Sequence, residues 1–456
     1  MSKIQSMMAG ALAAEKTTPI AGVEHLALEQ DTTNEYFEAK ADLDLQVEMI
    51  DQAEQVAGGL ETLLAQAEAA AENGGMNEAE AALFAIAADA TLTPFGGAEN
   101  VLLVPAQENY SEDGGRHEAT VAACEALGET AKKVWDTIVK FIKDMAKKIQ
   151  MFFVKNVALV GRLKGRAEKL KEAAGEISDS LEQKEAELKL GGAVKFFAKG
   201  GKVQDDVVKN VEEMLKLVED MSGSDKVGSA AVKYAESFVA ATKEDSDAKS
   251  LEITNGAAAT FYKDVAAAYG LKAVTGDDRF NDDKVEVSKG EEYLGGKSVF
   301  LAITKTKGGN KAKLEKLALM DAEDKAPKFT GKETIKALDK AGIVSLAEAV
   351  IKLCDKVIAL KEEDKALDKM GKDLLKVGDD LKGVMDDKEE SVVAKGVAKF
   401  GMMLIRGLAS KAHQPVVAVA GHATSVANAA TNFGIQSKDN YKKPEAKKDD
   451  KKEGEE

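Results

Sequence analysis

The hydrophobic residues of the N-terminal region recur at helical spacing. From Glu35 to about Ala90, leucine, valine and isoleucine follow one another mostly at steps of three and four residues, with acidic residues on the opposite face. Asn73-Gly74-Gly75 interrupts this pattern, and Met76–Ala90 resumes it. The spacing predicts an acidic helical hairpin over residues 30–95, followed by a loop over 96–118.

A second helical region is predicted over residues 119–270. Its first helix carries one hydrophobic stripe, formed by Leu127, Val134, Ile138, Phe141, Met145, Ile149 and Phe152. Two interpretations of this amphipathic helix remain open. Either the stripe faces a protein core and the surrounding lysines face solvent, or the helix lies on a membrane or along nucleic acid. Further charged helices are predicted up to residue 270, with breaks at Gly191-Gly192, Gly200-Gly201 and Ser222-Gly223-Ser224.

Around residue 284 the spacing of hydrophobic residues changes from the helical pattern to the alternating pattern of a β-strand. Val285 and Val287 alternate with polar residues, Ser298–Thr304 is a β run, and Gly308-Gly309-Asn310 is a turn signal before Leu314–Met320. These segments predict a small antiparallel β element of three strands near residues 284–320, within a unit over 271–326. Such a sheet needs helices to cover it.

The C-terminal region, residues 327–436, begins with a heptad pattern. Hydrophobic residues step by alternating fours and threes from Leu346 to Met385, with defects at Asp364, Gly371 and Gly378. We expect one long helix packed against a helical partner in the same chain, followed by apolar helices that include Gly396–Leu408. Residues 437–456 are highly charged and predict a disordered tail. The predicted fold class is mainly α.

Charge is distributed unevenly along the 456 residues. No basic residue occurs between Lys40 and Arg116, whereas residues 132–171 are strongly basic. The net charge of −16 favours solubility and argues against DNA binding by the chain as a whole, which leaves the basic stretch as the place where DNA contact is expected. Aromatic residues make up 5%, and Trp135 is the single tryptophan, so slim helical bundles are expected.

No catalytic, metal or cofactor motif is present in the sequence. Gly290–Ser298 resembles a phosphate-binding loop, but five residues separate its first glycine from the Gly-Lys-Ser triplet, and a strand follows in place of a helix. These glycines are expected to form a turn into the strand. Cys124 and Cys354 are expected to be reduced, and the four histidines lack metal-ligand spacing. No enzyme activity and no cofactor are predicted.

Membrane and export signals are weak. Met1–Ala14 lacks the sustained apolar core of a secretory signal, and Ala412–Ser437 is too polar to cross a bilayer alone. An alternative function nevertheless remains open, namely a membrane-active, pore-forming-like helical protein. It would insert the amphipathic helix Trp135–Val160 and the apolar segment Gly396–Leu408.

Several segments carry a resemblance to a known family. An acidic, Ala- and Glu-rich leader precedes the lysine-rich helix AKKVWDTIVKFIKDMAKKIQMFF, the strand segment EYLGGKSVFLAITKTKGG and the long helix LAEAVIKLCDKVIALKEEDKALDKMGKDLL. In the order and composition of these segments, residues 30 to 385 resemble the internal head proteins of large contractile-tailed bacteriophages. The resemblance implies a non-catalytic structural protein of the virion, made in the host cytoplasm and packaged inside the capsid beside the genome and other head proteins. Its oligomeric state is left open.

The resemblance also implies processing by a prohead protease, which prefers a small or aliphatic residue, any residue, and glutamate before the cut. Ala13-Ala14-Glu15 and Ala27-Leu28-Glu29 match this pattern, as Ala70-Ala71-Glu72 does by chance in so Ala- and Glu-rich a chain. Cleavage after Glu29 would remove residues 1–29 as a leader, and Glu15 is the second candidate. The protein is further expected to be ejected with the DNA.

The basic stretch supplies the residues expected to contact DNA or another surface. They are Lys132, Lys133, Lys140, Lys143, Lys147, Lys148, Lys155, Arg162, Lys164 and Arg166. Whether they meet DNA, a membrane or only other helices is left open by the sequence.

Overall fold

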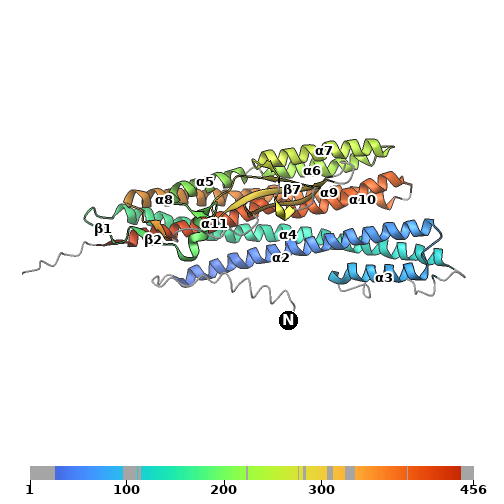
Figure 1. Cartoon of the computed structure of the whole chain (residues 1–456), viewed down its shortest axis with the longest axis horizontal. Helices are drawn as coiled ribbons and strands as arrows, with labels where there is room; N and C mark the ends of the chain where they lie inside the picture. Colours follow the sequence, from blue (N-terminus) through green and yellow to red (C-terminus); the bar gives the residue numbers. More distant parts are fainter. Residues whose placement is uncertain are drawn as a thin grey trace, which may run out of the picture.

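Long helices lie along the major axis of an elongated bundle, with a small sheet near its middle (Figure 1). The computed structural model describes residues 26–95, 110, 115–221, 224–275, 277–280, 284–305, 312–323, 334–387 and 389–442. The predicted mainly α class is confirmed. The predicted disordered tail, residues 437–456, is wrong for 437–442, which belong to the end of the last helix and to a short strand. Its other residues lie outside the described part of the chain.

The acidic hairpin consists of α2 (Leu26–Glu72) and α3 (Glu78–Leu92), joined by a turn with Gly74 and Gly75 at positive φ. Asn77 caps α3 by accepting a hydrogen bond from the Glu80 backbone, and the Glu80 side chain accepts one from the Asn77 backbone. The predicted hairpin is thereby confirmed. Helix α2 begins earlier than the pattern from Glu35 predicted.

The 60-residue helix α4 (Arg116–Gly175) is the central element of the bundle and contacts α2, α8 and α11. Its predicted stripe is buried, except that Phe141 is half-buried. Gln46 of α2 donates a hydrogen bond to the Phe141 carbonyl, 95 residues away, and the Met76 amide donates to Thr120. These contacts fix α2 antiparallel to α4. The stripe therefore faces a protein core, as the first interpretation held.

The prediction of charged helices with glycine breaks through residues 160–270 is wrong for 176–206, although the predicted breaks coincide with glycines at positive φ, Gly191, Gly200 and Gly201. This segment contains β1 (Glu182–Gln183), β2 (Glu187–Lys189), the 3-10 helix η4 (Gly191–Phe197), β3 (Ala198–Lys199) and β4 (Lys202–Val203). Strand β1 pairs with β10 (Tyr441–Lys442), and β2 with β9 (Thr334–Lys336). Pairing with distant segments has overridden a local sequence rich in helix formers. The chain then returns to helix in α5 (Val207–Met221), α6 (Ser224–Ala241) and α7 (Asp247–Ala268).

The sheet contains four antiparallel strands in the order β5-β6-β7-β8, one more than predicted. They are β5 (Lys272–Val274), β6 (Val285–Lys289), β7 (Lys297–Lys305) and β8 (Ala312–Asp321). Alternate residues of β7 face opposite sides: Val299 and Leu301 join the helical core, whereas Phe300 joins a smaller cluster on the outer face. Helices α10 and α11 contact β8, so the sheet has the helical cover that it needs.

The heptad region forms two helices and not one. Helix α8 (Lys340–Ala359) is separated from α9 (Glu363–Asp386) by a 3-10 turn, η6 (Leu360–Glu362). The hydrophobic positions from Leu346 to Leu381 are buried against other helices of the same chain, as expected, whereas Met385 is 37% exposed. Helices α10 (Val392–Lys411) and α11 (Gln414–Asp439) complete the bundle, with Pro415 in the first turn of α11.

Candidate functional site

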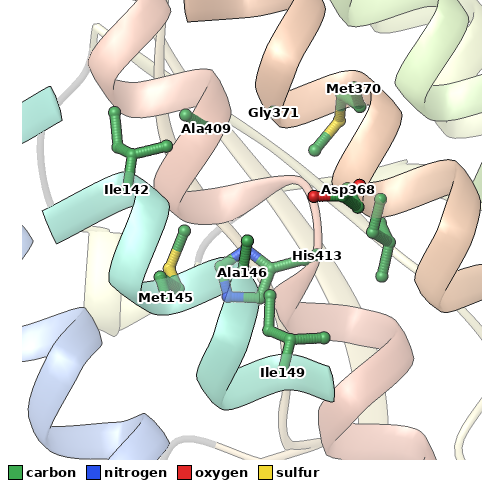
Figure 2. A pocket seen from close by; sticks show the side chains of 10 residues that line it. Ile142, Met145, Ala146, Ile149, Asp368, Met370, Gly371, Ala409 and His413 are labelled. Carbon is green, nitrogen blue, oxygen red and sulfur yellow. The ribbon is translucent and has the colours of Figure 1, made fainter. Parts of the chain in front are cut away.

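The cavity drawn in Figure 2 lies between α4, α9 and the junction of α10 with α11. It has a volume of about 20 Å³, which is room for about one water molecule. Its lining is mostly apolar and includes Ile142, Met145, Ile149, Met370 and His413. A cavity of this size and character cannot hold an organic substrate.

His413, the residue before α11, is the one imidazole in this cavity and is 2% exposed. Neither ring nitrogen has a partner of hydrogen-bond geometry among the described residues. Burial lowers the pKa of His413 to about 4, against a weaker opposing effect of the Ala409 carbonyl. The ring is therefore a neutral, packed group, and no acidic side chain holds it in the orientation that a general base requires.

A second hollow, an open groove of about 690 Å³, lies at the start of α8. Two of its polar side chains, Asp339 and Lys340, are engaged within the protein. Asp339 accepts a hydrogen bond from the Gly342 amide as the helix cap, and Lys340 Nζ donates to the Ile177 carbonyl. The groove presents no convergent set of unsatisfied polar groups of the kind found in ligand sites.

The cysteines and histidines do not form a reactive cluster. Within the described ranges, no group of three His, Cys, Asp or Glu side chains is placed to hold a metal ion. Cys124 is half-buried and Cys354 is buried, and both are free thiols. Burial raises the pKa of Cys354 to about 12, which disfavours the thiolate needed for nucleophilic chemistry.

The Gly290–Ser298 segment forms a structural turn, as expected. Gly295 and Gly296 have φ of 80° and 64° and lead directly into β7. His422 of α11 contacts this turn, with Nε2 2.6 Å from the Leu294 carbonyl oxygen. A Cβ on Gly295 would lie 2.6 Å from the His422 ring, so a side chain here would force the turn away from α11.

The basic residues of α4 divide into two groups. Members of the first make contacts inside the protein. Lys132 pairs with Asp386, Lys148 lies beside Asp42, Lys164 pairs with Asp355 and Arg166 donates to Asn432, while Lys155 and Arg162 also have partners. Four of the ten predicted contact residues, Lys132, Lys148, Lys164 and Arg166, thus join α4 to neighbouring helices.

The second group points to solvent from one face of α4. Lys133, Lys140, Lys143 and Lys147 are exposed, and Lys147 forms an ion pair with Asp144 at 3.2 Å. The spacing of seven, three and four residues places them within one side of the helix. This narrower face is the cationic surface that the fold leaves accessible.

The two candidate cleavage residues have different positions. Glu15 lies outside the described residues. Glu29 lies in the first turns of α2, which begins at Leu26. Because proteases bind their substrates as extended chain, cleavage there requires this end of α2 to be unwound when the protease acts.

None of the helices in the described ranges is both long enough and apolar enough to span a membrane. The two segments that a membrane-active protein would insert each contribute to the core: Trp135 is 2% exposed, and Ile405 and Leu408 are fully buried. Met151 and Val154 of the first segment are exposed.

Comparison with known proteins identifies the family of this chain. The family model of phiKZ-like phage internal head proteins matches residues 31–436, from the beginning of α2 to the end of α11. No curated protein and no solved structure matches the chain. Because the matched range covers most of the sequence and every long helix of the bundle, the chain belongs to the family of phiKZ-like phage internal head proteins.

Proposed function

We propose that this chain is a non-enzymatic structural protein of the head interior, packaged beside the genome and trimmed after Glu29 by the prohead protease. The observation that carries the proposal is the family match over residues 31–436. This match starts two residues after Glu29, so the part recognised as the family module is the part that would remain after cleavage.

The described side chains support a structural role over catalysis. Polar groups near the two hollows are packed or paired within the chain, as at His413 and Lys340. The acidic net charge of −16 keeps such a protein soluble at the high concentration of a filled head. Contact with packaged DNA would be limited to the exposed lysine face of α4, because the acidic α2–α3 hairpin repels phosphate.

Protection from external protease tests the location. Purified intact particles are treated with a protease, and the same treatment is applied to particles opened by osmotic shock. The proposal predicts that the protein survives in intact particles and is digested in opened ones. Digestion in both samples, with the major capsid protein intact, would place it on the outside and contradict the proposal.

We also propose that the protein leaves the head together with the DNA. The elongated shape of the bundle supports this step, because long helices side by side give a narrow cross-section (Figure 1). Particles emptied by DNA ejection should then contain much less of this protein than full ones, relative to the major capsid protein. Equal amounts in both would show that it stays behind.

The membrane-active alternative has less support, because Trp135, Ile405 and Leu408, from the two segments that would insert, are buried in the bundle. Flotation with liposomes at physiological salt separates the two functions. A packaged structural protein stays at the bottom of the gradient, and a membrane-active one floats with the lipid.

A further inference from the structure

Two exposed seams on different helices have the same unusual pattern. On α3, the residues Ala79, Leu83, Ile86 and Ala90 follow one another at steps of four, three and four and all face solvent. On α4, Lys147, Met151, Val154 and Ala158 have the same steps and also face solvent. We call these sets the α3 seam and the α4 seam. Steps of four and three place residues along the line by which two helices pack in a coiled coil.

The central residues of both seams are large and apolar. Leu83 and Ile86 are 68% and 67% exposed, and Met151 and Val154 are 57% and 47% exposed. A single exposed hydrophobic residue is ordinary on a protein surface. Two adjacent ones, flanked by alanine and in register along a helix, form a strip of the kind found at protein interfaces.

The charges around the two seams are opposite. Glu78, Glu80 and Asp89 are the charged residues of α3, and the helix has no base. The α4 seam starts at Lys147 and follows Lys140 and Lys143 on the same side of the helix, with Asp144 as the one acid among them. Two α3 seams would repel each other, and so would two α4 seams, whereas one of each attracts.

The two seams of one molecule cannot meet. Helix α3 packs against α2, the other helix of the hairpin, and its buried residues are Ala81, Phe84, Ala88 and Leu92. The hairpin turn is tied to the start of α4 by the Met76–Thr120 hydrogen bond. Thr120 lies about 46 Å before Met151 along α4, at the usual rise of 1.5 Å per residue. Helix α3 is about 22 Å long by the same rise, so it does not reach the α4 seam.

We propose that the α3 seam of one molecule docks on the α4 seam of a second copy of this chain. The contact is heterologous, because each molecule contributes a different surface to each of its two neighbours. Every copy then has one seam of each kind left to use, so association continues until it closes into a ring or grows as an open chain. This inference rests on the surface of the bundle and holds whether or not the protein is packaged.

Two full-length variants test the contact by complementation. Variant A carries Leu83→Glu and Ile86→Glu and keeps its α4 seam. Variant B carries Met151→Glu and Val154→Glu and keeps its α3 seam. All four positions are exposed, so the fold is retained, and circular dichroism checks this. Sedimentation velocity over a wide concentration range measures the assembly state, with Val392→Glu as the matched control because Val392 is 88% exposed elsewhere, at the start of α10.

We expect the wild type and Val392→Glu to form a concentration-dependent series of oligomers that weakens as salt is raised. Variants A and B should each be monomeric, with an association constant lower by roughly tenfold or more. Their mixture should form one-to-one dimers and nothing larger, since one compatible pair of seams remains.

Three outcomes would overturn the proposal. The first is a wild type that stays monomeric at all concentrations. The second is a mixture of A and B that remains monomeric, which would show that an intact α3 seam does not bind an intact α4 seam. The third is a variant that still assembles alone.

Discussion

The guanidinium of Arg406 lies over the ring of Trp135, with its central carbon 5.0 Å from the ring centroid. Both side chains are nearly fully buried. The same guanidinium has Nη1 3.5 Å from Oε1 of Glu61, so α10, α4 and α2 meet at one charged group. Burial raises the pKa of Glu61, and the charges of Arg406 and Lys399 partly oppose this rise. The contact replaces part of the hydration that the buried cation has lost.

Replacing Arg406 by alanine should therefore destabilise the bundle strongly. The change leaves Glu61 without its buried partner and opens a void beside Trp135, at a cost of about 3–5 kcal/mol. Urea unfolding followed by the fluorescence of the single tryptophan measures the free energy of unfolding. Lys40→Ala is the control, because its ion pair with Asp44 is exposed and contributes about 1 kcal/mol or less. Equal costs for the two variants would show that the Arg406 contact is not structural.

The glycines of α9 offer a matched pair of substitutions. A Cβ on Gly378 would lie 3.0 Å from Cζ2 of Trp135, whereas a Cβ on Gly371 would meet nothing within 4 Å. Gly371→Ala should stabilise the protein by about 0.5–1 kcal/mol, because alanine favours helix and reduces the entropy of the unfolded chain. Gly378→Ala must displace a ring that Arg406 holds, so we expect it to be less stable than Gly371→Ala by at least about 1 kcal/mol. Thermal unfolding of both variants checks the order, and the reverse order would contradict this packing.

A buried polar contact joins α4 to α11. The Thr424 hydroxyl lies 2.8 Å from Oδ1 of Asn156, and the Asn156 amide nitrogen has no partner among the described residues. Thr424→Val should cost about 1–3 kcal/mol, since it leaves a second polar atom of Asn156 unpaired. The double change Asn156→Leu with Thr424→Val should cost clearly less than Thr424→Val alone. A double-mutant cycle from urea unfolding measures this coupling, and purely additive effects would refute it.

The stability of the protein should fall as the pH is lowered from about 6.5 toward 4. Burial lowers the pKa of His413 and of His422 to about 4 in the folded protein, below the ordinary value of 6.5. Between these pH values the unfolded chain binds more protons than the folded one, so protonation favours unfolding. Each histidine accounts for up to about 3 kcal/mol at the acid end. Glu61 acts in the opposite direction, since its raised pKa stabilises the folded state as the pH falls.

His413→Leu tests the histidine contribution. The variant keeps the apolar character of the cavity and removes one titrating group, so the loss of unfolding free energy between pH 7 and pH 5 should be smaller than in the wild type. His117→Leu is the control, because His117 is exposed at the hairpin turn. An unchanged pH dependence in His413→Leu would mean that His413 is not held neutral by burial.

Periodicity predicted the elements whose residues carry it locally. The hairpin break at Asn73-Gly74-Gly75, the hydrophobic stripe of α4 and the buried heptad positions from Leu346 to Leu381 all appear where the spacing placed them. The strands after Val285 were also found, because alternation is a local signal.

What the sequence did not predict depends on partners far along the chain. Within residues 176–206, Glu182–Gln183 and Glu187–Lys189 have a sequence typical of helix but pair with β10 and β9, more than a hundred residues away. The lysines of α4 form a continuous basic stretch in sequence, yet Lys132 and Lys164 are matched by acids on α9 and α8. The exposure of Leu83 and Met151 was missed for the same reason, since spacing does not tell which side of a helix finds a partner.

The most direct test of the central claim is mass spectrometry of tryptic digests of purified phage particles. The account predicts abundant protein in the particles and the semi-tryptic peptide Gln30–Lys40, which a cut after Glu29 creates. The unprocessed chain would instead give Thr17–Lys40. Absence of the protein from particles would contradict its assignment as a packaged head protein, and particles that contain Thr17–Lys40 in place of Gln30–Lys40 would contradict its processing after Glu29.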